Sequence, residues 1–256
     1  MYNQPAVKID DVLAAAQKYA EKLAPFRCRD TSLIVHKALK NNKKVLFEGA
    51  QGTLLDLLHG TYPFVTSSST LAGSACVGTG VGPTVMDKVI GITKAYTTRV
   101  GSGPFPTELN DEVGETLRAT GKEFGATTGR PRRCGWLDLV ALRYAFRING
   151  INSISLMKLD VLSGLKEIKI CTAYELDGQT IKDYPVSPGD LERAKPIYET
   201  VNGWSEDITN VKNVKDLPRN AQDYIQFIGS ELATPIDVVS VGPGREQTLW
   251  LKPLFT

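Results

Sequence analysis

Residues 45–55 read Val-Leu-Phe-Glu-Gly-Ala-Gln-Gly-Thr-Leu-Leu, an apolar run followed by a glycine turn and two leucines. An apolar triplet of this kind predicts a buried strand, and Leu54 and Leu55 predict the start of a helix. Strand, glycine turn and helix together are typical of a parallel α/β unit. In such folds ligands bind beyond the carboxyl ends of the strands, so we expect a ligand near Gly49–Gly52.

Further strands and helices are predicted on either side of this stretch. Strands are expected at 89–97, 154–159 and 236–241, and helices at 9–23, 31–39, 136–148 and 216–232. The alternation of residues 168–174 before Asp177-Gly178 predicts a hairpin. Residues 185–215 look polar and loop-rich. We therefore expect an α/β fold with a mostly parallel central sheet and flanking helices, plus a smaller α+β subdomain containing a hairpin.

Composition limits the function. The chain has 256 residues and a formal net charge of +2, too balanced for nonspecific nucleic-acid binding, and no apolar run is long enough to span a membrane. The four cysteines are far apart and form no CxxC pair, which argues against structural zinc and suits a reducing compartment. We therefore expect a cytoplasmic protein that binds neither nucleic acid nor membrane.

Residues 125–133 read Gly-Ala-Thr-Thr-Gly-Arg-Pro-Arg-Arg, which places three arginines in a segment freed by two glycines. Guanidinium groups and hydroxyls suit a carboxylate or a phosphate. A solvated basic loop is the alternative from composition alone.

Two further segments carry weaker signals. Gln51 lies between glycines, and its amide complements a purine edge that bears an oxo group, although a glutamine in a turn is structural at least as often. Residues 66–70 supply five consecutive hydroxyls, which would form an anion site if they opened a helix, or else an ordinary capping run. The glycines of residues 78–82 only superficially resemble a dinucleotide fingerprint, because no strand precedes them.

Asp160 ends the sequence Met-Lys-Leu-Asp at a predicted strand end. Its carboxylate could accept hydrogen bonds from N1–H and the 2-amino group of guanine, donors that adenine lacks at those positions. The aliphatic stem of Lys158 could lie along the base. Residues 240–243 end another strand and could close over the same base. A surface lysine and aspartate are the alternative.

In order and spacing, these motifs resemble adenylosuccinate synthetase over nearly the whole chain. The matching segments are residues 47–56, 59–68, 99–109, 125–138, 158–162 and 240–243. The resemblance implies the GTP-dependent ligation of L-aspartate to IMP, which yields adenylosuccinate, GDP and phosphate. It further implies Mg²⁺ as cofactor and a homodimer.

The resemblance also implies roles for individual residues. IMP would be bound by Gln51, Thr66 and Arg130. L-aspartate would be bound by Ala126, Thr127, Thr128, Gly129, Arg130, Pro131 and Arg132. GTP would be bound by Arg132, Lys158, Leu159, Asp160, Ser240, Val241 and Gly242. Arg132 would reach a GTP phosphate and stabilise charge that develops during transfer.

The sequence departs from the family pattern in one important respect. The family's phosphate loop, Gly-Asp-Glu-Gly-Lys-Gly-Lys, holds the catalytic aspartate that binds Mg²⁺, and its Gly-His-Thr segment holds the catalytic acid. Neither segment occurs here, and the only histidines are His36 and His59. We therefore expect no catalytic or metal-binding residue in this chain, and we expect the chain alone to be inactive.

The domain organisation follows from the same comparison. We expect residues 1–40 to end a helical subdomain and residues 41–95 and 234–256 to form part of the central nucleotide-binding sheet. Residues 96–233 would form the C-terminal α+β subdomain with the predicted aspartate-binding loop, residues 126–132.

A sheet lacking its first strand would expose an apolar edge and favour self-association. A guanine-nucleotide-binding module without turnover is the alternative function, and a dinucleotide oxidoreductase has support only from residues 78–82.

Overall fold

The computed structural model describes residues 6–125 and 129–254. The helices are α1 (Ile9–Leu23), α2 (Thr31–Lys40), α3 (Ser74–Thr79), α4 (Glu112–Thr120), α5 (Leu139–Asn149), α6 (Pro188–Arg193) and α7 (Arg219–Glu231). The strands are β1 (Ile90–Lys94), β2 (Thr97–Arg99), β3 (Arg133–Gly135), β4 (Leu137–Asp138), β5 (Ser153–Met157), β6 (Glu167–Leu176), β7 (Gln179–Ile181), β8 (Lys195–Asn202), β9 (Ile236–Ser240) and β10 (Thr248–Trp250).

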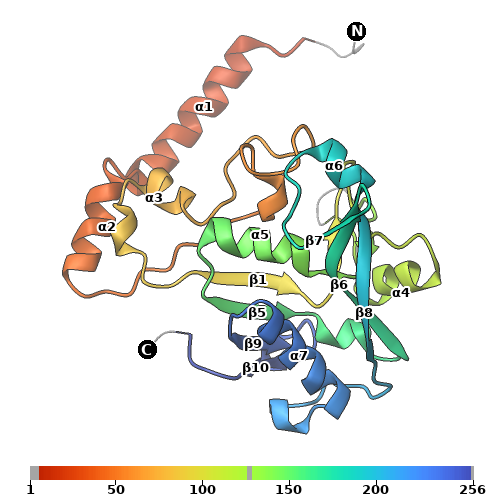
Figure 1. Ribbon diagram of the computed structural model, residues 1–256. Coiled ribbons are helices and arrows are strands. Elements are labelled where there is room, and N and C mark those ends of the chain that lie inside the picture. Colours follow the sequence, from red (N-terminus) through yellow and green to blue (C-terminus); the bar gives the residue numbers. More distant parts are fainter. Residues whose placement is uncertain (1–5, 126–128, 255–256) are drawn as a thin grey trace. The chain divides into compact units, whose positions relative to one another are not determined.

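A largely parallel sheet forms the centre of the fold, as the sequence predicts. Within the described ranges its strand order is β1-β5-β9-β10, with β1, β5 and β9 parallel and β10 antiparallel to β9. Figure 1 shows β1 and β5 side by side near α5. Every residue of β9 and four of the five of β5 are buried, as expected for parallel strands covered on both faces, although both strands include buried polar residues such as Ser155 and Asp237.

A second sheet is built around β6, which pairs with β7 and β8 in antiparallel fashion and with β4 in parallel. The predicted hairpin is confirmed, since Asp177 and Gly178 have φ of 51° and 80° between β6 and β7. Two successive positive φ values match the turn that Asp-Gly favours. The prediction of loop for residues 185–215 is wrong, because α6 and the eight-residue strand β8 lie there.

The main core packs α5 and α7 with the parallel sheet. Its buried members include Leu139 and Phe146 of α5, Leu156 of β5 and Tyr224 of α7. The hydroxyl of Tyr224 donates to the carbonyl of Ala95 at 2.6 Å, which ties α7 to the residue that follows β1. The helix predicted at 216–232 is confirmed as α7, which begins at Arg219.

One predicted strand is absent from the described residues, and two predicted boundaries differ from the structure. Residues 45–47 form no strand, and the Leu46 side chain is 70% exposed, so the apolar triplet does not join a sheet among the described residues. Helix α5 begins at Leu139 rather than Trp136, because Leu137 and Asp138 pair with β6. The Asp138 side chain then accepts the Ala141 N–H at 3.0 Å as an N-cap. Strand β5 ends at Met157, since Lys158 has a φ of 63°.

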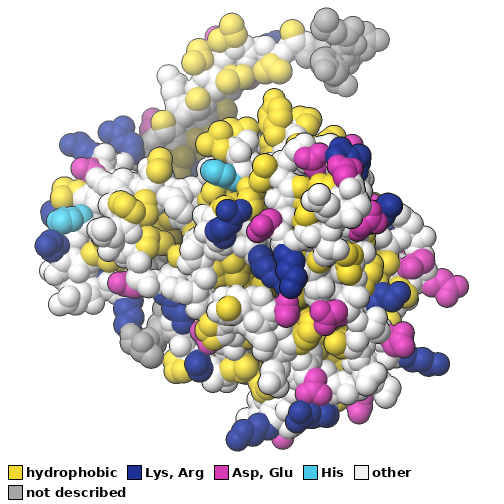
Figure 2. Space-filling view, in the orientation of Figure 1, with side chains coloured by type: hydrophobic (Ala, Val, Ile, Leu, Met, Phe, Trp, Pro, Cys, Tyr) yellow, Lys and Arg dark blue, Asp and Glu magenta, His cyan; other side chains and the backbone are white. Residues whose placement is uncertain are grey.

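The chain divides into two compact units, which are described separately. One consists of Met1–Phe47 with Cys76–Gly82, and the other of Glu48–Ala75 with Pro83–Thr256. In the first unit α1 and α2 match the predicted helices, and no residue of α1 is buried. Figure 2 shows apolar side chains exposed along α1. Ile9 and Leu23 of this helix are 75% and 62% exposed. In the part of the chain that is described, no helix has the length and apolar character needed to cross a membrane.

Self-association is expected through the edge of the central sheet. Strand β1 ends the strand order and its Ile92 side chain is 79% exposed, so backbone groups and an apolar side chain are both open to a second molecule. We expect concentration-dependent association in sedimentation velocity, and Ile92→Lys should shift the distribution towards monomer. Val186→Lys, at a loop position that is 67% exposed, is the control and should change nothing. A wild-type protein that stays monomeric at every concentration would contradict the expectation.

Candidate functional site

The side chain of Glu123 is fully buried and is surrounded by four donor groups. Its Oε1 accepts the Tyr96 hydroxyl at 2.5 Å and Lys158 Nζ at 2.7 Å. Its Oε2 accepts a guanidinium nitrogen of Arg132 at 2.7 Å, and Lys94 Nζ lies 2.9 Å from both oxygens. We call these five residues the Glu123 cluster.

A glycine allows the chain to enter this cluster. Gly121 follows α4, and a Cβ placed there would lie 2.3 Å from the Tyr96 hydroxyl oxygen and 2.7 Å from the Leu117 carbonyl oxygen. Any other residue would therefore push Tyr96 away from Glu123. The Gly121 carbonyl also accepts Lys158 Nζ at 2.6 Å. Residues 121–123 thus contact the segment after β5 through both backbone and side chain.

The electrostatics of the cluster favour an ionised carboxylate. Burial alone would raise the pKa of Glu123, but hydrogen bonds from Lys158, Tyr96 and Lys94 outweigh it and lower the pKa to about 2. Burial lowers the pKa of Lys94, although Glu123 opposes that shift. Two lysines and one arginine face one carboxylate, which leaves an excess of positive charge. Their side chains are 24–35% exposed and can still meet an anion.

The structure brings together the two strand ends that the sequence assigns to guanine. The backbone N–H of Lys158 donates to the Ser240 Oγ at 2.8 Å, which joins the ends of the neighbouring parallel strands β5 and β9. Leu159 and Val241 are fully buried, so their side chains belong to the core. At Gly242 a Cβ would lie 2.4 Å from the Gln247 side chain, so the backbone passes close to that residue.

Asp160 carries an acceptor that the protein does not use. Among the described residues, its Oδ1 is buried without a hydrogen-bond partner. Burial raises the pKa of this carboxyl, and the charge of Asp207 adds to the shift, while Lys158 opposes it. An unpartnered buried acceptor is rare in folded proteins and calls for an explanation. A ligand that donates hydrogen bonds would supply one.

The arginine loop, residues 125–133, is anchored at both ends. The Arg132 N–H donates to the Glu123 carbonyl at 2.8 Å, and the Gly125 N–H donates to the Arg130 carbonyl at 2.8 Å. Gly129 has a φ of 63° and donates to the Gly125 carbonyl, while Pro131 forms an antiparallel bridge with Phe124. Three predicted aspartate ligands, Ala126, Thr127 and Thr128, lie outside the described residues.

Arg133 differs from its neighbours in the loop. Its guanidinium makes a double ion pair with Glu108 at 2.7 and 2.5 Å, and it donates to the carbonyls of Gly101 and Gly103. The third arginine of the motif is therefore used to hold the loop that follows β2. The anion-binding prediction concerns Arg130 and Arg132 only.

Gln51 and Thr66 belong to a stretch organised by a second buried carboxylate, Asp56. Its Oδ1 accepts the N–H groups of Leu58 and His59, and its Oδ2 accepts the Ser69 hydroxyl and the Thr70 N–H. Burial would raise the pKa of Asp56, but these hydrogen bonds lower it to about 2. The five hydroxyls of residues 66–70 do not open a helix, because α3 begins at Ser74. Gln51 is exposed with a φ of 64°.

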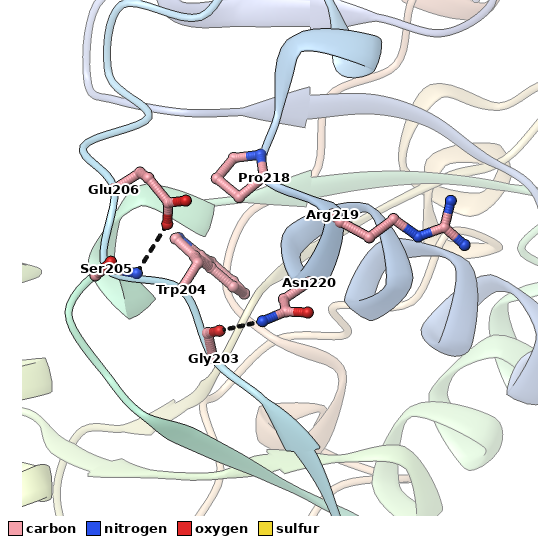
Figure 3. A pocket seen from close by; sticks show the side chains of 7 residues that line it. All are labelled: Gly203, Trp204, Ser205, Glu206, Pro218, Arg219 and Asn220. Carbon is pink, nitrogen blue, oxygen red and sulfur yellow. Dashed lines mark hydrogen bonds between the residues drawn. The ribbon is translucent and has the colours of Figure 1, made fainter.

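Two surface hollows lie elsewhere in the second unit. One, of about 290 Å³, is lined by Gly203, Trp204, Ser205, Glu206, Pro218, Arg219 and Asn220 (Figure 3). In it Asn220 donates to the Gly203 carbonyl, and Glu206 accepts the Ser205 N–H. The other, of about 410 Å³, lies around Phe105 and Arg133. No predicted ligand residue lines either hollow.

Sequence reasoning missed the residue at the centre of the site. Glu123 precedes the arginine loop by two residues. A single acidic residue next to this basic segment was the one signal that the sequence offered. Its partners Lys94, Tyr96 and Lys158 lie 29, 27 and 35 residues away, so no local pattern links them. Asp56 was also missed: two of its partners, Leu58 and His59, are local, but Ser69 and Thr70 lie 13 and 14 residues away.

Comparison with known proteins assigns the chain to one family. The adenylosuccinate synthetase family model matches residues 1–249. The adenylosuccinate synthetases of Bdellovibrio bacteriovorus and Thermobifida fusca are 62% and 56% identical to the chain over 254 residues. Each alignment covers 99% of this chain and 59% of the relative, so the chain spans less than two thirds of the length of these relatives.

A solved structure gives the same result for the fold. The fully ligated adenylosuccinate synthetase from Plasmodium falciparum is 44% identical and superposes with a TM-score of 0.93. That match covers 98% of this chain and 60% of the Plasmodium chain. The mixed α/β fold with its largely parallel sheet is therefore that of the family.

The lowered pKa of Glu123 predicts acid sensitivity. The unfolded chain takes up this proton near the ordinary value of 4.5 and the folded chain only at about 2, so stability falls as the pH drops through that window. We expect Glu123 to contribute a loss of roughly 3 kcal/mol. Urea unfolding of the wild type and of Glu123→Gln, from neutral pH to about pH 2, measures it. The variant should show the smaller loss, and the part due to Asp56 should remain. Equal pH dependence in both proteins would contradict the assignment.

Proposed function

The chain belongs to the adenylosuccinate synthetase family, and we propose on this premise that it supplies the guanine-binding and aspartate-binding part of a GTP-dependent ligase. The reaction joins L-aspartate to IMP and yields adenylosuccinate, GDP and phosphate. GTP phosphorylates the 6-oxygen of IMP, and the aspartate amine then displaces that phosphate.

The unpartnered Oδ1 of Asp160 is the observation that carries the proposal. A guanine ring presents N1–H and the 2-amino group on one edge, and a carboxylate can accept from both. Adenine presents no donor at either position, so the same carboxylate would reject it. Lys158 and Ser240, joined by a hydrogen bond of 2.8 Å, place the strand ends that would frame the base together with Leu159, Val241 and Gly242.

The arginine loop would bind the second substrate. The carboxylates of L-aspartate suit the guanidinium forks of Arg130 and Arg132 and the hydroxyls and backbone groups of residues 126–131. Arg132 keeps further N–H donors beyond the one given to Glu123, and one of them would reach a GTP phosphate. Gln51 would hold the IMP base, Thr66 its 5′-phosphate, and Arg130 would bridge IMP and aspartate.

Magnesium does not fit the residues that the structure describes. Within 6–125 and 129–254, no group of three His, Cys, Asp or Glu side chains is arranged to hold a metal ion. No step of the reaction is therefore assigned to Mg²⁺ in this chain. What these residues do is bind and orient: Asp160 selects the base, and Arg132 neutralises charge.

We expect the chain to work as part of a homodimer, in keeping with its family. Cys28, Cys76, Cys134 and Cys171 are all free thiols, which supports a reducing compartment such as the cytoplasm.

Phosphate release tests the activity of the chain. The purified protein is incubated with GTP, Mg²⁺ and IMP, with and without L-aspartate, and GTP binding is measured in parallel. We expect GTP to bind and no aspartate-dependent phosphate to be released. Aspartate-dependent release would show that the chain contains a complete catalytic site. Absence of GTP binding would overturn the proposed guanine site.

A guanine-nucleotide-binding module without turnover is the second candidate. The buried, unpartnered Oδ1 of Asp160 supports it equally, because recognition of a guanine base requires no phosphoryl-transfer residue. Supplying the remainder of a family relative separates the two candidates. Restored aspartate-dependent phosphate release supports the ligase, whereas binding that stays unproductive supports the module.

Asp160→Asn should reduce base discrimination. An amide cannot accept from both guanine donors as the carboxylate does, so the preference for GTP over ATP should fall by roughly 2–4 kcal/mol. Competition binding of the two nucleotides measures this. Asp177→Asn, in the exposed β6–β7 turn, is the matched control and should keep the preference. Unchanged preference for GTP in Asp160→Asn would refute the role of Asp160.

Arg130→Lys should weaken L-aspartate binding. Lysine keeps the charge but loses the bidentate geometry, and one charge-assisted hydrogen bond is worth roughly 1.5–3 kcal/mol, so the Kd should rise about tenfold to hundredfold. Calorimetric titration with L-aspartate in the presence of IMP and GDP tests this. Arg219→Lys, an exposed residue that pairs with Asp223 on α7, serves as control. The same Kd in Arg130→Lys and wild type would exclude Arg130 from the aspartate site.

A further inference from the structure

We propose that Glu123 is a positioning residue that links the guanine-binding segment to the aspartate-binding loop, so that binding of the two ligands is coupled. This inference rests on the proposed function, because it takes Lys158 and Arg132 as parts of those two sites. Glu123 itself contacts neither ligand in this account. It acts through the two cations that it holds.

Each carboxylate oxygen of Glu123 contacts a different segment. Oε1 binds Lys158 at 2.7 Å, and Oε2 binds Arg132 at 2.7 Å. The backbone repeats the pattern, because the Gly121 carbonyl accepts Lys158 Nζ and the Glu123 carbonyl accepts the Arg132 N–H. A shift of either segment therefore acts on the same short stretch, residues 121–123.

Charge makes this link depend on Glu123. Lys94, Lys158 and Arg132 surround one buried carboxylate, and Glu123 is the acidic group within 4.0 Å of each of the three in the described structure. Without its negative charge, like charges at close range would repel each other in a partly desolvated site. Lys158 and Arg132 would then lose their common arrangement even if the fold persisted.

Both cations can contact Glu123 and a ligand at once. An ammonium group has three donors and a guanidinium has five, so each retains donors beyond the hydrogen bonds described above. A guanine nucleotide that fixes the segment of residues 158–160 would thereby fix Glu123, which orders Arg132 before aspartate arrives. A ligand that meets a site already ordered loses less conformational freedom on binding. By linkage, aspartate would strengthen nucleotide binding by the same factor.

A double titration tests the coupling. The Kd of GDP for the full chain is measured in the presence of IMP, with and without saturating L-aspartate. In the wild type we expect L-aspartate to lower the Kd of GDP by roughly 5–150-fold. In Glu123→Gln both ligands should still bind singly, and the factor should fall below about twofold. Glu231→Gln is the matched control, since it removes a carboxylate that pairs with Arg143 at 2.6 Å elsewhere, and it should keep the wild-type factor.

The outcomes separate this inference from the function on which it rests. Failure of the wild type to bind GDP or L-aspartate would overturn the proposed function and the coupling with it. Independent binding of both ligands in the wild type would overturn the coupling alone. Retention of the wild-type factor in Glu123→Gln would show that Glu123 is merely structural.

A second variant guards against loss of folding. Glu123→Asp keeps the charge but is one methylene shorter, so it cannot reach Lys158 and Arg132 together. If Glu123→Gln does not fold, Glu123→Asp should fold, bind each ligand and show a reduced factor. A full wild-type factor in Glu123→Asp would overturn the inference.

Discussion

A buried carboxylate must find partners or lose its charge, and Glu123 satisfies this constraint with four donor groups from separate parts of the chain. Lys94 ends β1, Tyr96 follows it, Lys158 follows β5, and Arg132 closes the arginine loop. The positions of these segments are consequently fixed relative to one another. The tight approach of Gly121 to Tyr96 is part of the same arrangement.

Two carboxylates near the ends of the parallel strands experience opposite environments. Glu123 is fully paired, which lowers its pKa to about 2, whereas Asp160 keeps one buried oxygen without a partner and has a raised pKa. The first suits a positioning role, because its hydrogen bonds are made to residues of the protein. The second suits recognition, because its remaining acceptor is available to a ligand. Lys158 takes part in both arrangements, because its ammonium group donates to Glu123 and its backbone N–H donates to the Ser240 hydroxyl.

Local sequence patterns, namely hydrophobic periodicity and turn residues, were sufficient to predict the fold class. Helices α1, α2 and α7, the hairpin and strands β1, β5 and β9 were predictable because periodicity and turn residues report on them directly. Strand β8 was missed because Lys195, Glu199 and other polar residues alternate along a largely exposed face. Residues 45–47 were wrongly predicted to form a strand because they are apolar. An apolar triplet does not reveal whether a partner strand is present.

The site was only partly accessible from the sequence. The segments 158–160 and 240–242 were identified by their strand-end positions and by family resemblance, and the structure brings them together. The Glu123 cluster depends on contacts between residues up to 35 positions apart, which no local motif encodes. Family motifs name ligand residues. They leave out the buried groups that hold those residues in place.

Carbon-13 NMR titration of the side-chain carboxyl groups, without and with GDP, tests the central claim most directly. The free protein should show Glu123 titrating far below its ordinary pKa and Asp160 above its own. GDP should lower the pKa of Asp160, because guanine donors stabilise the charged form, and should leave that of Glu123 low. A Glu123 that titrates near its ordinary value, or an Asp160 that does not respond to GDP, would contradict the account.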